Sequence, residues 1–358
     1  MRYSWVVAVG VVTLAFLAIA IAVSHHIGIP IRDPEGTLLG KRVVLPFIFM
    51  GIFLGLDVVI RARRLMRRSE ISRTFALRTV FIERWWWQRI VIALLGFSMF
   101  HVTYLSYRNL KSFLPLFNYR TYDAELLQTD RWLSFGHAPA TAMHNMLGDD
   151  VMAHLLSTAY LAFVPFVPIS VAAALTFSSR LRDGFVYVSA AIYCWILGTI
   201  SYYLIPTLGP FASARWQFRD LPVTGVTRLQ DVLIQQRLDL YADPIGIVKV
   251  QSVAGFASLH VGMVFTAYLV ARHFRHRLLG WALLAALVPT TLATIYFGWH
   301  FIVDDIAGLL IGWLAVVFAR WTVYPRVRFA ALARRAPDVR REGPGSSVEA
   351  VHASVEAG

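Results

Sequence analysis

The feature of this chain that most limits its possible folds is a series of long apolar stretches. Eight of them approach the roughly 20 apolar residues that a helix needs to cross a bilayer. They cover residues 5–23, 43–60, 89–107, 151–175, 185–205, 256–271, 278–297 and 300–319. Because a bilayer offers the backbone no hydrogen-bond partners, such stretches are expected to be helical. The sequence therefore predicts an all-α integral membrane protein with about eight transmembrane helices.

The first stretch, residues 5–23, follows a short basic segment that contains Arg2. No run of small residues suitable for cleavage comes after it, so we expect a retained membrane helix rather than a signal peptide. Cys194 is the only cysteine and lies in an apolar run. A single cysteine excludes a disulfide within the chain and a metal site built from cysteines.

The net charge of +13 is unevenly distributed among the segments that join the apolar stretches. If both termini are cytoplasmic, the inner segments, counted together with Asp57 near the inner end of the stretch 43–60, hold 22 of the 34 Lys and Arg residues but only 8 of the 21 Asp and Glu residues. Cytoplasmic loops of membrane proteins are enriched in Lys and Arg, and anionic lipid headgroups attract clusters such as RARRLMRR at 61–68. We therefore predict a multi-pass cell-membrane protein with cytoplasmic termini, and not a nucleic-acid-binding protein.

The pattern divides the chain into three parts. Residues 1–85 contain two N-terminal spans and a basic cytoplasmic loop, residues 86–322 form the main membrane domain, and residues 323–358 are a polar, disordered cytoplasmic tail. Between the spans, residues 120–150 are expected to form amphipathic helices on the outer membrane surface. The outer loop at 206–255 is rich in Pro, Gly and aromatic residues and is expected to be an ordered lid.

Three polar side chains stand out within the apolar stretches: His260, His300 and Asp304. With the termini inside, the stretches that begin near His260 and His300 both enter the membrane from the outer side. We therefore expect all three side chains at one depth near the extracytoplasmic face. Ionisable residues in membrane spans are costly and usually have a partner or a function.

The spacing of His300 and Asp304 places them on one face of a helix, one turn apart. A carboxylate bonded to one ring nitrogen fixes the tautomer and leaves a lone pair on the other nitrogen, which is the arrangement of an activated nucleophile or base. His260 can protonate a leaving oxygen as a general acid. These groups suffice for phosphoryl transfer through a phosphohistidine, without a metal or another cofactor.

Simpler interpretations of the same residues stay open. A lone histidine in a span is often only packed and hydrogen-bonded, and Asp304 beside Asp305 can mark a solvated helix start stabilised by the helix dipole. His300, Asp304 and His260 can also be read as three ligands of a metal ion. The conjunction of three such residues from two spans favours catalysis.

Two short motifs resemble those of a known family. SLHVG at 258–262 and GWHFIVDD at 298–305 resemble the second and third signature motifs of the type 2 phosphatidic acid phosphatase superfamily. Their residues resemble more closely those of the branch that includes inositol phosphorylceramide synthases and their bacterial relatives. The resemblance covers roughly residues 120–320 and implies a six-helix membrane core, here preceded by two added spans.

The resemblance also implies roles for individual residues. His300 matches the nucleophile that takes the phosphoryl group, Asp304 its orienting carboxylate and His260 the general acid. Ser258 and Gly262 match residues beside the phosphate, where they would donate hydroxyl and backbone hydrogen bonds.

The sequence departs from the family pattern in its cationic residues. Thr294 stands where the family has an arginine six residues before the nucleophile, and no clear KxxxxxxRP motif is present. A phosphate site still needs positive charge near the developing oxyanions. The expected substitutes and additional hydroxyl donors lie at outer positions: Lys249, Arg215, Arg219, Tyr202 and Tyr203.

The sequence therefore predicts a membrane enzyme that acts on a lipid phosphate or phospholipid at the extracytoplasmic face. Water as acceptor would make it a phosphatase, and a sugar, inositol or lipid hydroxyl would make it a transferase. A polyprenyl-phosphate-dependent glycosyltransferase is an alternative, but only Asp33 and Glu35 offer carboxylates in the first outer loop. A proton-coupled transporter is a second alternative, although the centres of the spans are nearly free of charge.

Overall fold

A computed structural model describes residues 3–33, 44–246 and 249–325 of the chain. The predicted tail and Glu35 therefore lie outside the described residues, apart from the first three positions of the tail. Within the described ranges all regular structure is helical, as predicted. The helices are α1 (Ser4–Ile27), α2 (Val44–Met66), α3 (Arg73–Arg84), α4 (Trp87–Phe117), α5 (Asp123–Leu133), α6 (Pro139–Leu147), α7 (Val151–Leu161), α8 (Phe163–Phe177), α9 (Leu181–Leu204), α10 (Pro210–Ser213), the 3₁₀ turn η2 (Arg215–Phe218), α11 (Gly225–Ala242), α12 (Leu259–His273), α13 (Arg277–Tyr296) and α14 (Ile302–Val323).

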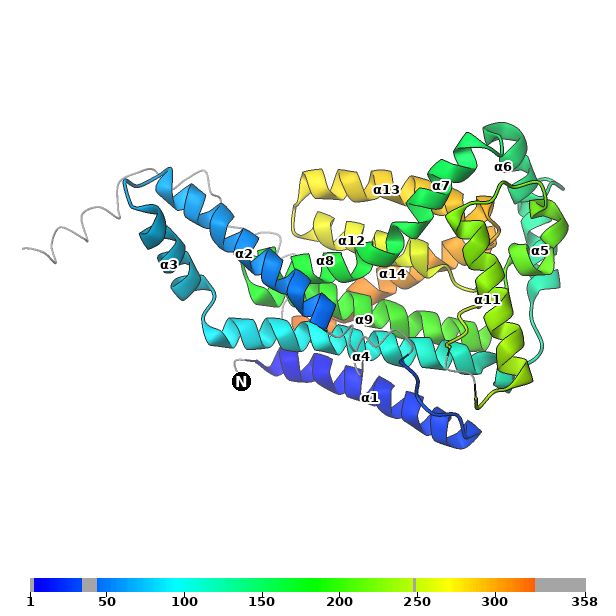
Figure 1. Cartoon of the computed structure of the whole chain (residues 1–358), viewed down its shortest axis with the longest axis horizontal. Coiled ribbons are helices and arrows are strands. Elements are labelled where there is room, and N and C mark those ends of the chain that lie inside the picture. The colour runs from blue at the N-terminus through cyan, green and yellow to red at the C-terminus, as the bar shows by residue number, and fades with distance from the viewer. Residues whose placement is uncertain (1–2, 34–43, 247–248, 326–358) are drawn as a thin grey trace, which may run out of the picture. The chain divides into compact units, whose positions relative to one another are not determined.

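The helices belong to one unit, Met1–Val323, built around α9. Helix α9 packs against α4, α8, α12 and α14, and α12 also packs against α13 and α14. Nearly every residue of α9 between Gly184 and Cys194 is buried, so this helix is the centre of the bundle. The N-terminal helix α1 runs alongside α4 (Figure 1).

In the ranges that the structure describes, six helical segments are long and apolar enough to cross a membrane, so the predicted count of eight is not confirmed. One of the six joins α7 to α8 as a single span, Val151–Phe177. Helices form at both remaining predicted positions but do not qualify as spans within the described residues. Helix α12 has only 15 residues, because the residues before Leu259 form an extended segment. Helix α2 carries Asp57 and several arginines in its second half.

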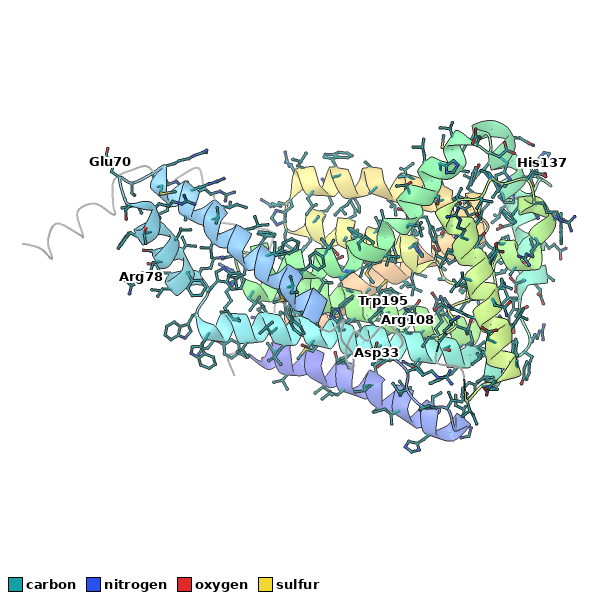
Figure 2. The ribbon with its side chains drawn as sticks, in the orientation of Figure 1. Asp33, Glu70, Arg78, Arg108, His137 and Trp195 are labelled. Atoms are coloured by element: carbon teal, nitrogen blue, oxygen red, sulfur yellow. The ribbon has the colours of Figure 1, made fainter. Side chains whose placement is uncertain are left out.

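One end of the bundle carries the segments that were expected on the outer surface. Helices α5 and α6 form within residues 120–150, and α10, η2 and α11 order the long segment after α9. Figure 1 shows α5, α6 and α11 together at this end, next to the start of α14. Glu70 and Arg78, at the α2–α3 hairpin, lie at the opposite end from His137 (Figure 2).

Candidate active site

The turn between α13 and α14 positions His300. The backbone N–H groups of Trp299 and His300 both donate to the Thr294 carbonyl, at 2.9 and 3.2 Å. Gly298 adopts φ +66°, a left-handed conformation that favours glycine. Its carbonyl accepts a hydrogen bond of 2.8 Å from the Phe211 N–H, which fastens the outer segment onto this turn.

His300 and Asp304 lie close together, although His300 is in the turn before α14 and not on the shared helix that the spacing predicted. His300 Nδ1 lies 3.4 Å from Asp304 Oδ2, and the same oxygen accepts from the Phe301 N–H at 3.0 Å. The 3.4 Å distance is at the long end of hydrogen bonding, and such contacts often tighten when substrate binds. Burial lowers the pKa of His300 to about 4 despite the opposing charge of Asp305. The imidazole is therefore neutral near pH 7, as a nitrogen nucleophile must be.

His260 lies beside His300, with 6.3 Å between the ring centroids. Its ring stacks on Tyr160 at 4.2 Å and contacts Phe163 at 4.0 Å. Among the described residues, neither ring nitrogen of His260 has a hydrogen-bond partner. The structure thus brings together the two histidines from separate helices and leaves His260 free to exchange a proton.

Close packing of α12 against α14 fixes the relative position of the two histidines. The Ser258 N–H donates to the Asp304 carbonyl at 2.9 Å, which joins the two sequence motifs directly. Gly262 and Gly308 meet backbone to backbone, so that a Cβ on Gly262 would lie 2.8 Å from the Gly308 carbonyl oxygen. The Gly262 N–H is already used by the Ser258 carbonyl within the helix. In this structure Gly262 therefore serves helix packing.

Two further polar residues of the site were not among the predicted site residues, although one of them, Asp305, lies within the motif at 298–305. Asp305 Oδ2 accepts a hydrogen bond of 2.9 Å from Thr294 Oγ1, at the position where the family has an arginine. Asp130, on α5, accepts from the Ile302 N–H at 2.9 Å and so caps the start of α14. Burial, aided by the charge of Asp304, raises the pKa of Asp130 to about 7. An isolated acid in an outer helix gives no sequence signal of this long-range contact.

The cationic substitutes expected from the sequence do not converge on the histidines. Lys249 is exposed. Arg215 is also exposed and pairs with Asp231 at 3.1 Å. Arg219 is exposed as well, in the segment after η2.

A different cation, Lys111, lies buried on α4. Its Nζ is 4.7 Å from the centroid of the Tyr202 ring and 3.4 Å from the Tyr107 hydroxyl. The neighbouring Tyr203 donates its hydroxyl to the Leu110 carbonyl at 2.8 Å. Of the two expected tyrosines, Tyr202 therefore borders this cation and Tyr203 is engaged by the backbone of α4.

A polar cavity of about 360 Å³ opens at the end of the bundle that carries α6 and η2. It shares Arg131, Ala138 and Gln217 with a narrow cavity that reaches His300. The lining residues of the larger cavity are Arg131, Ala138, Thr141, His144, Asn145, Asp149, Trp216, Gln217, Asp220 and Leu221. In the described part of the chain, no three His, Cys, Asp or Glu side chains are grouped so as to hold a metal ion.

The chain matches a known protein family. A family model described as the PAP2 superfamily matches residues 124–318, more than half of the 358-residue chain, and the match includes both histidines and Asp304. No curated protein and no solved structure matches the chain. On the strength of the family match, this chain is a member of the PAP2 superfamily.

Proposed function

We propose that this protein transfers the phosphoryl or phosphodiester group of a membrane lipid through a covalent intermediate on His300. Membership in the PAP2 superfamily indicates a phosphatase-like enzyme of lipid phosphates in a membrane. The observation that carries the finer proposal is the position of His300, which lies 3.4 Å from Asp304 Oδ2 and 6.3 Å, ring to ring, from His260.

In the first step His300 Nε2 attacks phosphorus in line with the leaving oxygen. The bond from phosphorus to the leaving oxygen breaks as the N–P bond forms, and His260 gives its proton to that oxygen. Asp304 accepts the Nδ1–H of His300 and stabilises the positive charge that develops on the ring. Since His260 is half-buried against Tyr160 and Phe163, the proton passes in a largely dry environment.

In the second step an acceptor hydroxyl attacks the phosphohistidine. The N–P bond breaks, a new O–P bond forms and the acceptor proton returns to His260, which restores the enzyme. Water gives hydrolysis, and an alcohol gives transfer. The polar cavity of about 360 Å³ that continues from the passage to His300 supports a hydrophilic alcohol as acceptor, such as an inositol or sugar hydroxyl.

The extracytoplasmic face is the proposed location of this chemistry. The site lies at the end of the bundle that carries α5, α6 and α11, away from the arginine-rich α2–α3 hairpin (Figure 1). Because basic loops favour the cytoplasmic side, the hairpin orients the opposite end outward.

Trapping of the intermediate tests the proposal. Purified protein would be incubated in EDTA with ³²P-labelled phosphatidic acid or phosphatidylinositol, and acid-labile label on the protein would be measured together with product. We expect label on wild type, none on His300→Gln, and a rate at least tenfold lower for Asp304→Asn. The exposed His137→Gln is the matched control and should behave as wild type.

Full turnover by His300→Gln would reject the histidine nucleophile. Label and turnover that disappear in EDTA would favour a metal site instead.

A further inference from the structure

Lys111 is a buried cation that has no role in the proposed mechanism. A buried ammonium group is costly unless an opposite charge compensates it. Only 9% of Lys111 is exposed, yet within the described residues no carboxylate lies at ion-pair distance from its Nζ. Its recorded neighbours are the Tyr107 hydroxyl and the faces of two tyrosine rings, Tyr107 and Tyr202. The side chain is therefore positioned without the anion that it needs.

Lys111 borders the same site as the two histidines. Its charge acts on both imidazoles, His260 and His300. Its backbone is also tied to the segment that leads into α12, because Gln251 Nε2 donates to the Lys111 carbonyl at 3.0 Å. An anionic ligand of this site could therefore supply the negative charge that compensates the ammonium group of Lys111.

The segment that leads into α12 also contacts α9 next to Tyr202, the tyrosine beside Lys111. Tyr202 follows Ser201 on α9, and Ser201 Oγ accepts from the Ala257 N–H at 3.0 Å. Ala257 precedes Ser258 and the first turn of α12, which carries His260. Helices α4 and α9 pack against each other, and Figure 2 shows Arg108 and Trp195 where these two helices lie side by side.

We propose that Lys111 is the phosphate-binding cation of this site and that its Nζ contacts a non-bridging oxygen of the lipid phosphate. The inference rests on the proposed function and assigns the positive charge that Thr294 cannot supply. In phosphoryl transfer, negative charge is spread over the equatorial oxygens, and fixed cations stabilise it in a site from which water is excluded. The substrate phosphate would in turn be the missing counter-ion of the buried ammonium.

This assignment gives a function to the part of the chain before the family match. The match begins at residue 124, whereas Lys111 lies on α4. The helix that precedes the matched region would therefore complete the site rather than only anchor the protein.

The test uses orthovanadate, an analogue of the transferring phosphoryl group, with Lys111→Met and Lys111→Arg. Methionine keeps the length of the side chain and removes its charge, and arginine keeps the charge. We expect vanadate to raise the Tm of wild type and Lys111→Arg but not of Lys111→Met. The value of kcat/KM for the lipid phosphate should fall roughly 100-fold in Lys111→Met. Arg120→Met, an exposed residue paired with Glu125, is the control.

The ligand-free proteins separate this role from a structural one. Removing an uncompensated buried charge should leave the Tm of Lys111→Met equal to or above that of wild type. A structural lysine would instead give a lower Tm with an unchanged response to vanadate, which would overturn the inference.

The inference and the proposed function fail in different ways. Normal vanadate binding and normal labelling of His300 in Lys111→Met would reject only the role of Lys111. Turnover without His300 would reject the phosphohistidine, while the vanadate response of Lys111→Met still decides whether this lysine binds phosphate.

Discussion

Burial shifts the pKa of individual side chains around His300. Asp130 is an example, because it caps α14 while it is enclosed beside the carboxylate of Asp304. Desolvation disfavours its ionised form, so that its pKa rises from 3.8 to about 7. A group of this kind links the stability of the protein to pH.

The predicted effect of Asp130 on stability has a definite sign. Between pH 4 and 7 the folded protein retains a proton that the unfolded chain has lost. The corresponding stabilisation is complete below pH 4 and is lost as the pH rises toward 7. We expect the Tm of wild type to fall between pH 5 and 7.5, and we expect Asp130→Asn, which keeps the acceptor oxygen for Ile302, to flatten this fall. Thermal unfolding in detergent measures it, and a slope equal to that of wild type would contradict the prediction.

A second residue-scale prediction concerns Thr294. Thr294→Val keeps the shape of the side chain but removes the hydroxyl that Asp305 Oδ2 accepts from. Leaving a buried acceptor without its donor costs about 1–3 kcal/mol. Equilibrium unfolding should show this loss, whereas Thr158→Val, which removes an exposed hydroxyl bonded within its own helix, should cost less than about 0.5 kcal/mol.

At the scale of elements, glycines let α12 and α14 approach closely enough to align the two motifs. A Cβ on Gly308 would collide with the Ser258 carbonyl oxygen, and a Cβ on Gly312 would lie 2.6 Å from the Gly262 carbonyl oxygen. Small residues at such crossings are typical of membrane helices, because close backbone contact replaces the hydrophobic effect there. The distance between His260 and His300 therefore depends on glycines at this crossing, because any larger residue would push the two helices apart.

We predict that Gly308→Ala lowers stability by about 1–3 kcal/mol through overpacking. It should also lower the rate of His300 labelling at least tenfold, because α14 must move away from Ser258. Gly51→Ala on α2 is the control, since no atom lies within 4 Å of the added Cβ. Wild-type labelling by Gly308→Ala would show that this crossing does not set the geometry of the site.

At the scale of the whole unit, a buried charged cluster holds the α2–α3 hairpin on the core. Asp57 accepts from Arg61 Nε at 2.8 Å, Arg84 Nε at 2.6 Å and Trp85 Nε1 at 3.0 Å. Arg84 also donates to the Thr176 carbonyl at the end of α8. The cluster thus joins α2 and α3 to the spans of the main domain, at the end opposite the site.

Asp57→Ala should leave the arginines without compensation and lower stability by about 3–5 kcal/mol. Since the cluster is remote from His300, the folded fraction should still be labelled at the wild-type rate. Unfolding and labelling measured on the same preparation test both statements, with the exposed Glu70→Ala as the control. A loss of labelling per folded molecule would show that the hairpin is coupled to the site.

Hydrophobic pattern and charge predicted much of this architecture because both act locally along the chain. Helices form at all eight predicted apolar positions, although within the described parts of the chain six segments qualify as spans. The proximity of His300 to Asp304 also follows from their spacing of four residues, although His300 lies in the turn before α14 rather than on the helix. The count of spans was less predictable, because the extended segment before α12 is held by contacts with α9 and α14 rather than by its own sequence.

By itself the sequence determined the helical membrane class and the proximity of His300 to Asp304, since each depends on neighbours along the chain. Only the tertiary structure decided that His260 lies beside His300, that Thr294 bonds Asp305 and that Asp130 caps α14. Lys111 is the clearest case. Nothing near it in the sequence distinguishes it, and its position follows from how α4 packs against α9. Such contacts join residues far apart in the chain, and they exist only once the helices have packed.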